Sequence, residues 1–179
     1  AGTTLAAGAQ HNVLVGLNAG DAISTGDRNI GIGKDAVGLL STTADNVAIG
    51  YQAGDALTTG STNIAIGSDA LGAAQTTTDC VAIGHNALLL NTVSGNIAIG
   101  ANALDTATDG DDNVAIGYAA GQAMTSANSN VVVGSFTGDG ITLGANNVAL
   151  GYATLSAANA GSKSVAIGSG ALAVQVPQN

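Results

Sequence analysis

The segment Asn46-Val47-Ala48-Ile49-Gly50 is one copy of a pentad that recurs along the whole chain and decides its fold. The pattern Asn-(Val/Ile)-x-(Ile/Val/Leu)-Gly occurs ten times, counting two copies in which Cys80 and Ser164 replace the first residue. Of the nine intervals between the pentad glycines, eight are 17 residues long and one is 16. A period this short and regular is typical of a solenoid of stacked coils. The pentad glycines are Gly16, Gly33, Gly50, Gly67, Gly84, Gly100, Gly117, Gly134, Gly151 and Gly168.

Each repeat has room for about two strands and two turns, and the β-branched residues of the pentad favour strands. We predict an all-β fold, a parallel β-roll (β-solenoid) of about ten 17-residue coils. Strand spacing makes such a rod on the order of 45 to 50 Å long. A single repeat domain is expected over residues 1–179, with edges at 1–11 and 169–179 and the array at 12–168. Besides the glycines, the predicted ladder residues, which hydrogen-bond from coil to coil, are Asn12, Asn29, Asn46, Asn63, Asn96, Asn113, Asn130 and Asn147.

The two faces of the predicted strand are both apolar. The first and third strand residues, such as Val47 and Ile49, point to one face, and the middle residue, such as Ala48, points to the other. A strand that is apolar on both sides is normally covered on both sides. We therefore expect the Val/Ile face to fill the coil, and the column of small residues to pack lengthwise against identical chains in a homo-oligomer.

Two positions that follow the pentad trade side-chain volume. Where the fourth residue after the pentad glycine is Gly, the seventh is large, as in the pairs Gly54 with Leu57 and Gly121 with Met124. Where the fourth is Leu71, Leu104 or Leu155, the seventh is Ala. This pattern predicts one interior pocket that is filled from either side. The remaining pairs are Gly20 with Ile23, Gly138 with Ile141, Leu71 with Ala74, Leu104 with Ala107 and Leu155 with Ala158.

Composition excludes several functions. The 179 residues carry twelve acidic side chains, all Asp, and three basic ones, for a net charge of −9. Such a chain repels nucleic-acid backbones and anionic lipids, so we expect no nucleic-acid partner and no direct membrane insertion. No apolar run approaches the roughly 20 residues of a membrane helix. The sequence begins Ala1-Gly2-Thr3, and we expect a processed product or an excised piece.

The pentads Asn46-Val47-Ala48-Ile49-Gly50 and Ser164-Val165-Ala166-Ile167-Gly168 resemble the head repeat of YadA-type trimeric autotransporter adhesins. The longer unit at residues 46–60 is similar to arrays in bacteriophage tail fibres, which attach virions to host cells. The repeat here is longer than that of the adhesin heads. The resemblance covers nearly the whole chain and implies a left-handed β-roll in an intertwined homotrimer.

Candidate catalytic chemistry is sparse. The segment Gly31-Ile32-Gly33-Lys34-Asp35 loosely matches a phosphate loop, but Asp35 stands where such a loop needs Ser or Thr, and the repeat already explains Gly33. The chain has two histidines, His11 and His85, and no Glu. The single Cys80 replaces a ladder asparagine and is expected to be a buried, inert thiol. We therefore predict no catalytic residues, no cofactor and no enzyme activity.

Two columns suggest alternatives that we do not favour. Asp105, Asp109, Asp111 and Asp112 are hard oxygen ligands near one turn, which makes calcium-dependent adhesion an alternative. A solvated acidic turn is the simpler interpretation, so no metal is expected. A single file of threonines suggests an ice-binding surface, but it shifts register midway and lacks a second row. This file comprises Thr25, Thr42, Thr59 and Thr76, and then Thr92, Thr108, Thr125 and Thr142.

The residue after each pentad glycine alternates large with small from the third repeat onward. Tyr51, His85, Tyr118 and Tyr152 are separated by Ser or Ala. Rings on adjacent coils would crowd each other, whereas rings two coils apart have about 9.6 Å between them. Corner packing explains the alternation, and an exposed ladder that stacks on sugars or contacts a receptor is the alternative.

From sequence we predict a non-enzymatic, trimeric, extracellular fibre domain that binds a host-cell surface glycan or protein receptor. A phage or viral tail or capsid fibre is the first interpretation, and the head of a bacterial surface adhesin is the second. Repeated weak contacts suit attachment, because several copies of a feature on one particle add up in avidity.

Overall fold

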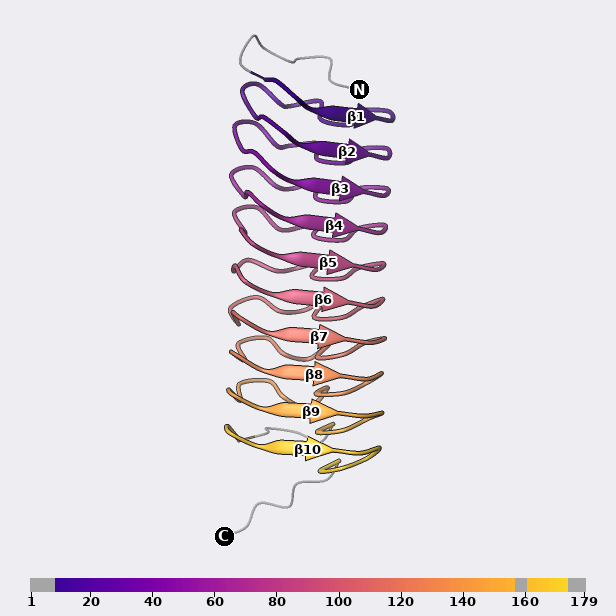
Figure 1. Cartoon of the computed structure of the whole chain (residues 1–179), viewed down its shortest axis with the longest axis vertical. Coiled ribbons are helices and arrows are strands. Elements are labelled where there is room, and N and C mark those ends of the chain that lie inside the picture. Colours follow the sequence, from indigo (N-terminus) through magenta and orange to yellow (C-terminus); the bar gives the residue numbers. More distant parts are fainter. Residues whose placement is uncertain (1–8, 157–160, 174–179) are drawn as a thin grey trace.

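The computed structural model describes residues 9–156 and 161–173, and within them the chain forms one parallel sheet of ten short strands. Each coil contributes one strand, and the coils stack into a straight rod with the first and last strands at opposite ends (Figure 1). The expected solenoid is therefore confirmed. The strands are β1 (Val13–Val15), β2 (Ile30–Ile32), β3 (Val47–Ile49), β4 (Ile64–Ile66), β5 (Val81–Ile83), β6 (Ile97–Ile99), β7 (Val114–Ile116), β8 (Val131–Val133), β9 (Val148–Leu150) and β10 (Val165–Ile167).

Each strand pairs with its own copy in the next coil. Val47 lies opposite Ile64, and Ala48 lies opposite Ala65, and the same in-register pairing runs from β1 to β10. The second strand that we expected in each coil is absent from the described residues, where turns and bends follow the pentad. Left-handed backbone explains this difference, because positive φ angles recur at fixed places after the pentad, such as Asp69 (57°) and Leu71 (50°).

The asparagine ladder is formed and buried. The Oδ1 atom of Asn46 accepts from the backbone N–H of Asn63 at 3.1 Å and from its Nδ2 atom at 3.1 Å. The Nδ2 atom of Asn46 also donates to the carbonyl of Gly60 at 3.0 Å, which ties the start of the coil to its end. Because the Asn46 amide satisfies buried backbone groups in two directions, this one side chain fixes both the stacking and the closure of its coil.

From Gly16 to Gly151, each pentad glycine lies so close to the backbone of the next coil that no side chain fits. Gly67 has a φ of +132°, a region that only glycine visits readily, and a Cβ atom built on it would lie 2.6 Å from the carbonyl oxygen of Gly84. The period of the glycines is therefore a steric requirement of the coil-to-coil contact.

In several coils the interior is filled as the volume trade predicts, with one large side chain at either the fourth or the seventh position after the pentad glycine. The coil after Gly33 differs, because Val37 and Leu40 are both buried there. A Cβ atom on Gly54 would meet Leu57 at 3.0 Å, and one on Gly121 would meet the sulfur of Met124 at 2.7 Å. Leu71 and Ala74 are both fully buried in the opposite arrangement. The pairing of Leu155 with Ala158 involves a residue outside the described part of the chain.

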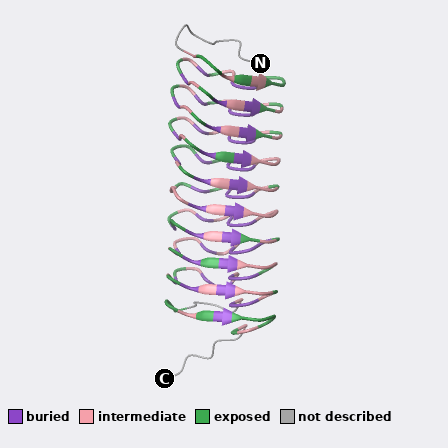
Figure 2. Cartoon of the chain, viewed as in Figure 1, coloured by how far each residue is buried: buried purple, intermediate pink, exposed green. Residues whose placement is uncertain are grey.

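The middle residue of the strand belongs to the same interior, which corrects the expected orientation of the faces. Ala48 and its counterparts from β2 to β10 are buried, whereas the first and third residues of these strands are half-buried or exposed (Figure 2). Because successive strand residues point to opposite sides, these flanking residues face outward. The coil is thin, so the strand can offer only a small residue to the space that Leu57 already fills. Where the strand residue is larger, as at Val132, the facing residue is Gly138. A Cβ atom built on Gly138 would lie only 2.6 Å from a methyl carbon of Val132.

Candidate functional site

The outward residues of the ten strands form a continuous apolar surface, here called the strand face. It comprises the first and third residues of each strand, and none of them is buried. Ile49, Ile64 and Ile116 remain 36 to 37% exposed although the coils above and below flank them. Parallel sheets usually have both faces covered, and exposed apolar surfaces that run this far mark interaction sites. The strand face is therefore the candidate interface of the molecule.

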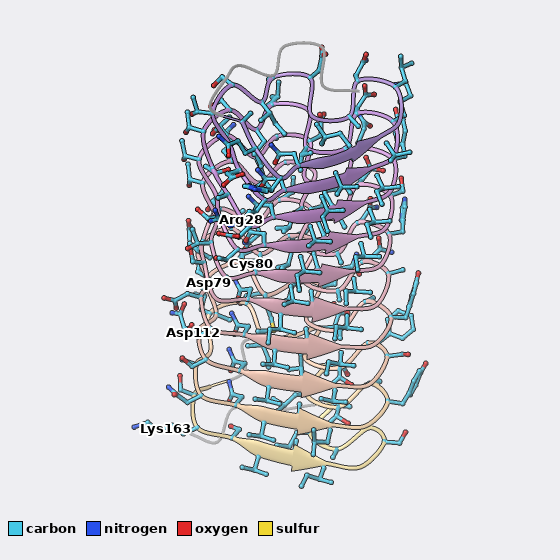
Figure 3. All side chains as sticks on the ribbon, turned by 45° about the horizontal axis from the view of Figure 1, so that its top comes forward. Arg28, Asp79, Cys80, Asp112 and Lys163 are labelled. Carbon is cyan, nitrogen blue, oxygen red and sulfur yellow. The ribbon has the colours of Figure 1, made fainter. Side chains whose placement is uncertain are left out.

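The strand face has a polar border on the side where each strand begins. Arg28, Asp79, Asp112 and Lys163 lie along this edge of the rod (Figure 3). The guanidinium of Arg28 binds both carboxylate oxygens of Asp45, at 2.7 and 2.8 Å, and holds the pKa of that carboxyl below its usual range. Exposed charges resist burial in an apolar contact, so this column limits the strand face on one side.

The opposite border is the corner column that follows the pentad glycines. Tyr51, His85, Tyr118 and Tyr152 are all exposed there, as the alternative to corner packing requires. Each of these residues lies two coils further along the rod than the one before it, with one coil between them. The ammonium of Lys34, in the same column, lies 5.2 Å from the centre of the Tyr51 ring.

Phe136 completes an aromatic group that the sequence reasoning missed. Its ring centre lies 5.2 Å from that of Tyr118 and 6.0 Å from that of Tyr152, with ring planes at 76° and 85°. Phe136 follows Ser135, the small residue of the corner column, and fills the gap between the two tyrosines. The signal was present in the sequence, because the position that Phe136 occupies is polar in the first six repeats.

The four acidic residues considered for calcium do not assemble into a site. Asp105 is half-buried and accepts a hydrogen bond from Gln122 at 3.1 Å, and burial raises the pKa of its carboxyl. Asp109, Asp111 and Asp112 lie exposed on the following turn. Within residues 9–156 and 161–173, no three or more His, Cys, Asp or Glu side chains are placed to hold a metal ion.

The nucleophile and base candidates lie apart. Cys80 is buried, its sulfur lies 3.5 Å from the carbonyl oxygens of Thr78 and Val93, and burial raises the pKa of the thiol. His11 contacts Asp27 at 3.2 Å near the N-terminal end of the rod, and His85 lies on the corner column. This placement gives the thiol no adjacent base.

The segment that loosely matches a phosphate loop is part of the array. Gly31 and Ile32 belong to β2, and a turn follows them, with the ammonium of Lys34 bound to the carboxylate of Asp35. The ammonium that would have to bind a phosphate is therefore already paired with a carboxylate. None of the described segments is a helix that could cross a membrane.

Fold and surface together define a β-solenoid repeat protein with one open apolar sheet face. No family model, curated protein or solved structure matches the chain.

Proposed function

We propose that the protein is a non-enzymatic fibre domain whose copies pack lengthwise through the strand face and present the corner columns to a surface. The observation that carries this proposal is the strand face itself, two columns of Val, Ile and Leu that run along all ten strands. Burying such side chains is favourable by about 25 cal/mol per Å², and no other part of the described chain covers them.

The proposed assembly is a homotrimer, a number that rests on the resemblance to adhesin heads and tail fibres. Association through the strand face replaces the alanine contact expected from the sequence, because the alanines lie inside the coil. The physical reason for an oligomer is unchanged, since a parallel sheet with one open apolar face remains to be covered.

The proposed biological role is attachment to a host-cell glycan or protein receptor, outside the cell, as part of a phage or viral fibre. The head of a bacterial surface adhesin is the alternative. Each corner feature would occur three times on a trimer, so weak contacts would add up in avidity. The sequence that flanks this segment in the full gene discriminates the two, by an outer-membrane anchor in one case and a fibre assembly region in the other.

Sedimentation of the purified protein tests the assembly. We expect a trimer for the unchanged chain and dissociation when Ile66, Ile83 and Ile99 are all changed to Lys, because a buried interface does not accept three unpaired charges. Leu143→Lys is the control, since Leu143 is 68% exposed on a turn outside the strand face. A stable monomer with an uncovered strand face would overturn the proposal, and so would a triple variant that stays trimeric.

A further inference from the structure

The three rings of Tyr118, Phe136 and Tyr152, here called the aromatic stripe, are exposed over three consecutive coils. They are 50%, 38% and 60% exposed, respectively. Each pair meets edge to face, the favoured geometry for aromatic contacts, so the rings support one another while much of their area stays open to solvent.

The backbone at Phe136 carries a cost that interior packing does not explain. Its φ is 57°, in the left-handed region that Asn and Asp adopt more readily than an aromatic residue. In earlier repeats the same position holds such residues, among them Asn86 and Asn102. An unfavourable residue kept at an exposed position is a reason to look for a binding role there.

The residues around the aromatic stripe define the chemistry of its ligand. No residue at positions 101, 102, 119, 135, 153 or 169 is charged. Aromatic platforms that stack nucleic-acid bases come with a basic groove, and this stripe has none in a chain of net charge −9. An anionic glycan is disfavoured for the same reason.

We propose that the aromatic stripe is a stacking platform for an uncharged oligosaccharide. The apolar C–H faces of sugar rings pack on the electron-rich faces of aromatic rings, and the tyrosine hydroxyls can exchange hydrogen bonds with sugar hydroxyls. The stripe spans two coil intervals, about 9.6 Å, so it suits a short chain of sugars better than a single ring. This inference rests on the attachment role proposed above and names the ligand class.

The test is binding of the intact oligomer to immobilised neutral hexasaccharides of glucose and of N-acetylglucosamine, with heparin and single-stranded DNA as charged probes. We expect a neutral hexasaccharide to bind and the charged probes not to bind. Phe136→Asn and Tyr152→Ser introduce residue types that other repeats carry at these positions, so the coil should fold. Each should weaken binding about tenfold or more, equivalent to roughly 1.4 kcal/mol.

Leu39→Ser is the control, because Leu39 is an exposed apolar residue (53% exposed) that lies outside both the corner column and the aromatic stripe, and binding should be unchanged. The inference is overturned if no neutral hexasaccharide binds, if the charged probes bind as tightly, or if Phe136→Asn leaves affinity intact. It is also overturned if Phe136→Asn dissociates the oligomer, which would place the stripe in the subunit interface. Sedimentation of the lysine variants is independent of this result, so failure of glycan binding leaves the proposed assembly standing.

Discussion

The Nδ2 atom of Asn96 donates to Oδ1 of Asn91 at 3.0 Å, and this is a repair of the asparagine ladder. Elsewhere the acceptor of this hydrogen bond is the ladder residue one coil earlier. For example, the Nδ2 atom of Asn113 donates to Oδ1 of Asn96 at 3.2 Å. Cys80 cannot supply an amide oxygen, and the Asn91 side chain takes that role from the interior of the same coil. This coil is also the one of 16 residues, so three departures from the repeat occur together.

Removing the repair should cost stability, and rebuilding the standard ladder should restore it. We expect Asn91→Ala to destabilise the protein by about 1 to 3 kcal/mol, because it leaves buried polar groups with fewer partners. Cys80→Asn combined with Asn91→Ala should recover most of that loss, since Leu88 with an alanine reproduces the pair Leu104 with Ala107. Urea unfolding of the two single variants and the double variant measures the coupling. Additive losses in the double variant would contradict the repair.

Coil interiors should be interchangeable between their two packing solutions. Leu57→Ala should cost about 2 to 5 kcal/mol by leaving a cavity, and Gly54→Leu alone should be destabilising because its side chain meets Leu57. The double variant recreates the buried pair Leu71 with Ala74, so it should recover most of the lost free energy of unfolding. A cost of about 1 to 2 kcal/mol should remain, because the new leucine adopts left-handed backbone as Leu71 does. A double-mutant cycle in urea checks this, and no recovery would mean that the interiors are not equivalent.

A pentad glycine that contacts the next coil, such as Gly67, should tolerate no side chain at all. We expect Gly67→Ala to lower stability by more than about 3 kcal/mol or to prevent folding, because the new methyl group would overlap the backbone of the next coil. Gly161→Ala is the control, since a Cβ atom there has nothing within 4 Å among the residues that the structure describes. Comparing the melting temperatures of the two variants measures the difference. Equal effects would show that backbone contact between glycines does not hold the coils together.

Two acidic residues should respond to pH with opposite signs. Burial raises the pKa of Asp55 above 3.8. The like charges of Asp35 and Asp69 raise this pKa further, and the opposing effect of the Lys34 ammonium is smaller than theirs. The folded state therefore disfavours the ionised form, and this cost is present above the folded pKa and disappears below the unfolded one. Asp55→Asn should raise the melting temperature at pH 7, and the gain should vanish toward pH 3.

Asp45 is the counterpart for this comparison. Its hydrogen bonds with Arg28 lower its pKa, so it stabilises the fold above its unfolded pKa and loses that contribution as pH falls through the folded value. Asp45→Asn should therefore lower the melting temperature at pH 7, with the deficit closing in acid. Melting curves of both variants between pH 3 and 7 provide the measurement. A deficit for Asp55→Asn at pH 7 would contradict the assigned direction.

Much of the fold could be predicted because the information is local and periodic. The 17-residue spacing aligns identical pentads, so in-register pairing, the Asn46-to-Asn63 ladder and the Gly67-to-Gly84 contact all follow from repetition. The volume trade between Gly54 and Leu57 could also be predicted, because both residues lie in one turn. The three tyrosines of the corner column are exposed, which fits the alternative rather than the favoured corner packing, and their role in receptor binding stays a prediction. Phe136 was missed because it belongs to the neighbouring position.

By itself, the sequence determined the coil, its period, its ladders and the presence of two apolar strand faces. Only the tertiary structure decided which face is inside. Alternation places Val47 and Ile49 on one face of the strand and Ala48 on the other, but it does not tell which face lies inside the coil. Greater hydrophobicity suggested that the β-branched pair fills the interior. The turn opposite the strand already places Leu57 in that narrow space, so a small residue must face it and the larger ones must face outward. Side-chain volume across the coil, which depends on how the turns fold back, therefore set the orientation that hydrophobicity could not.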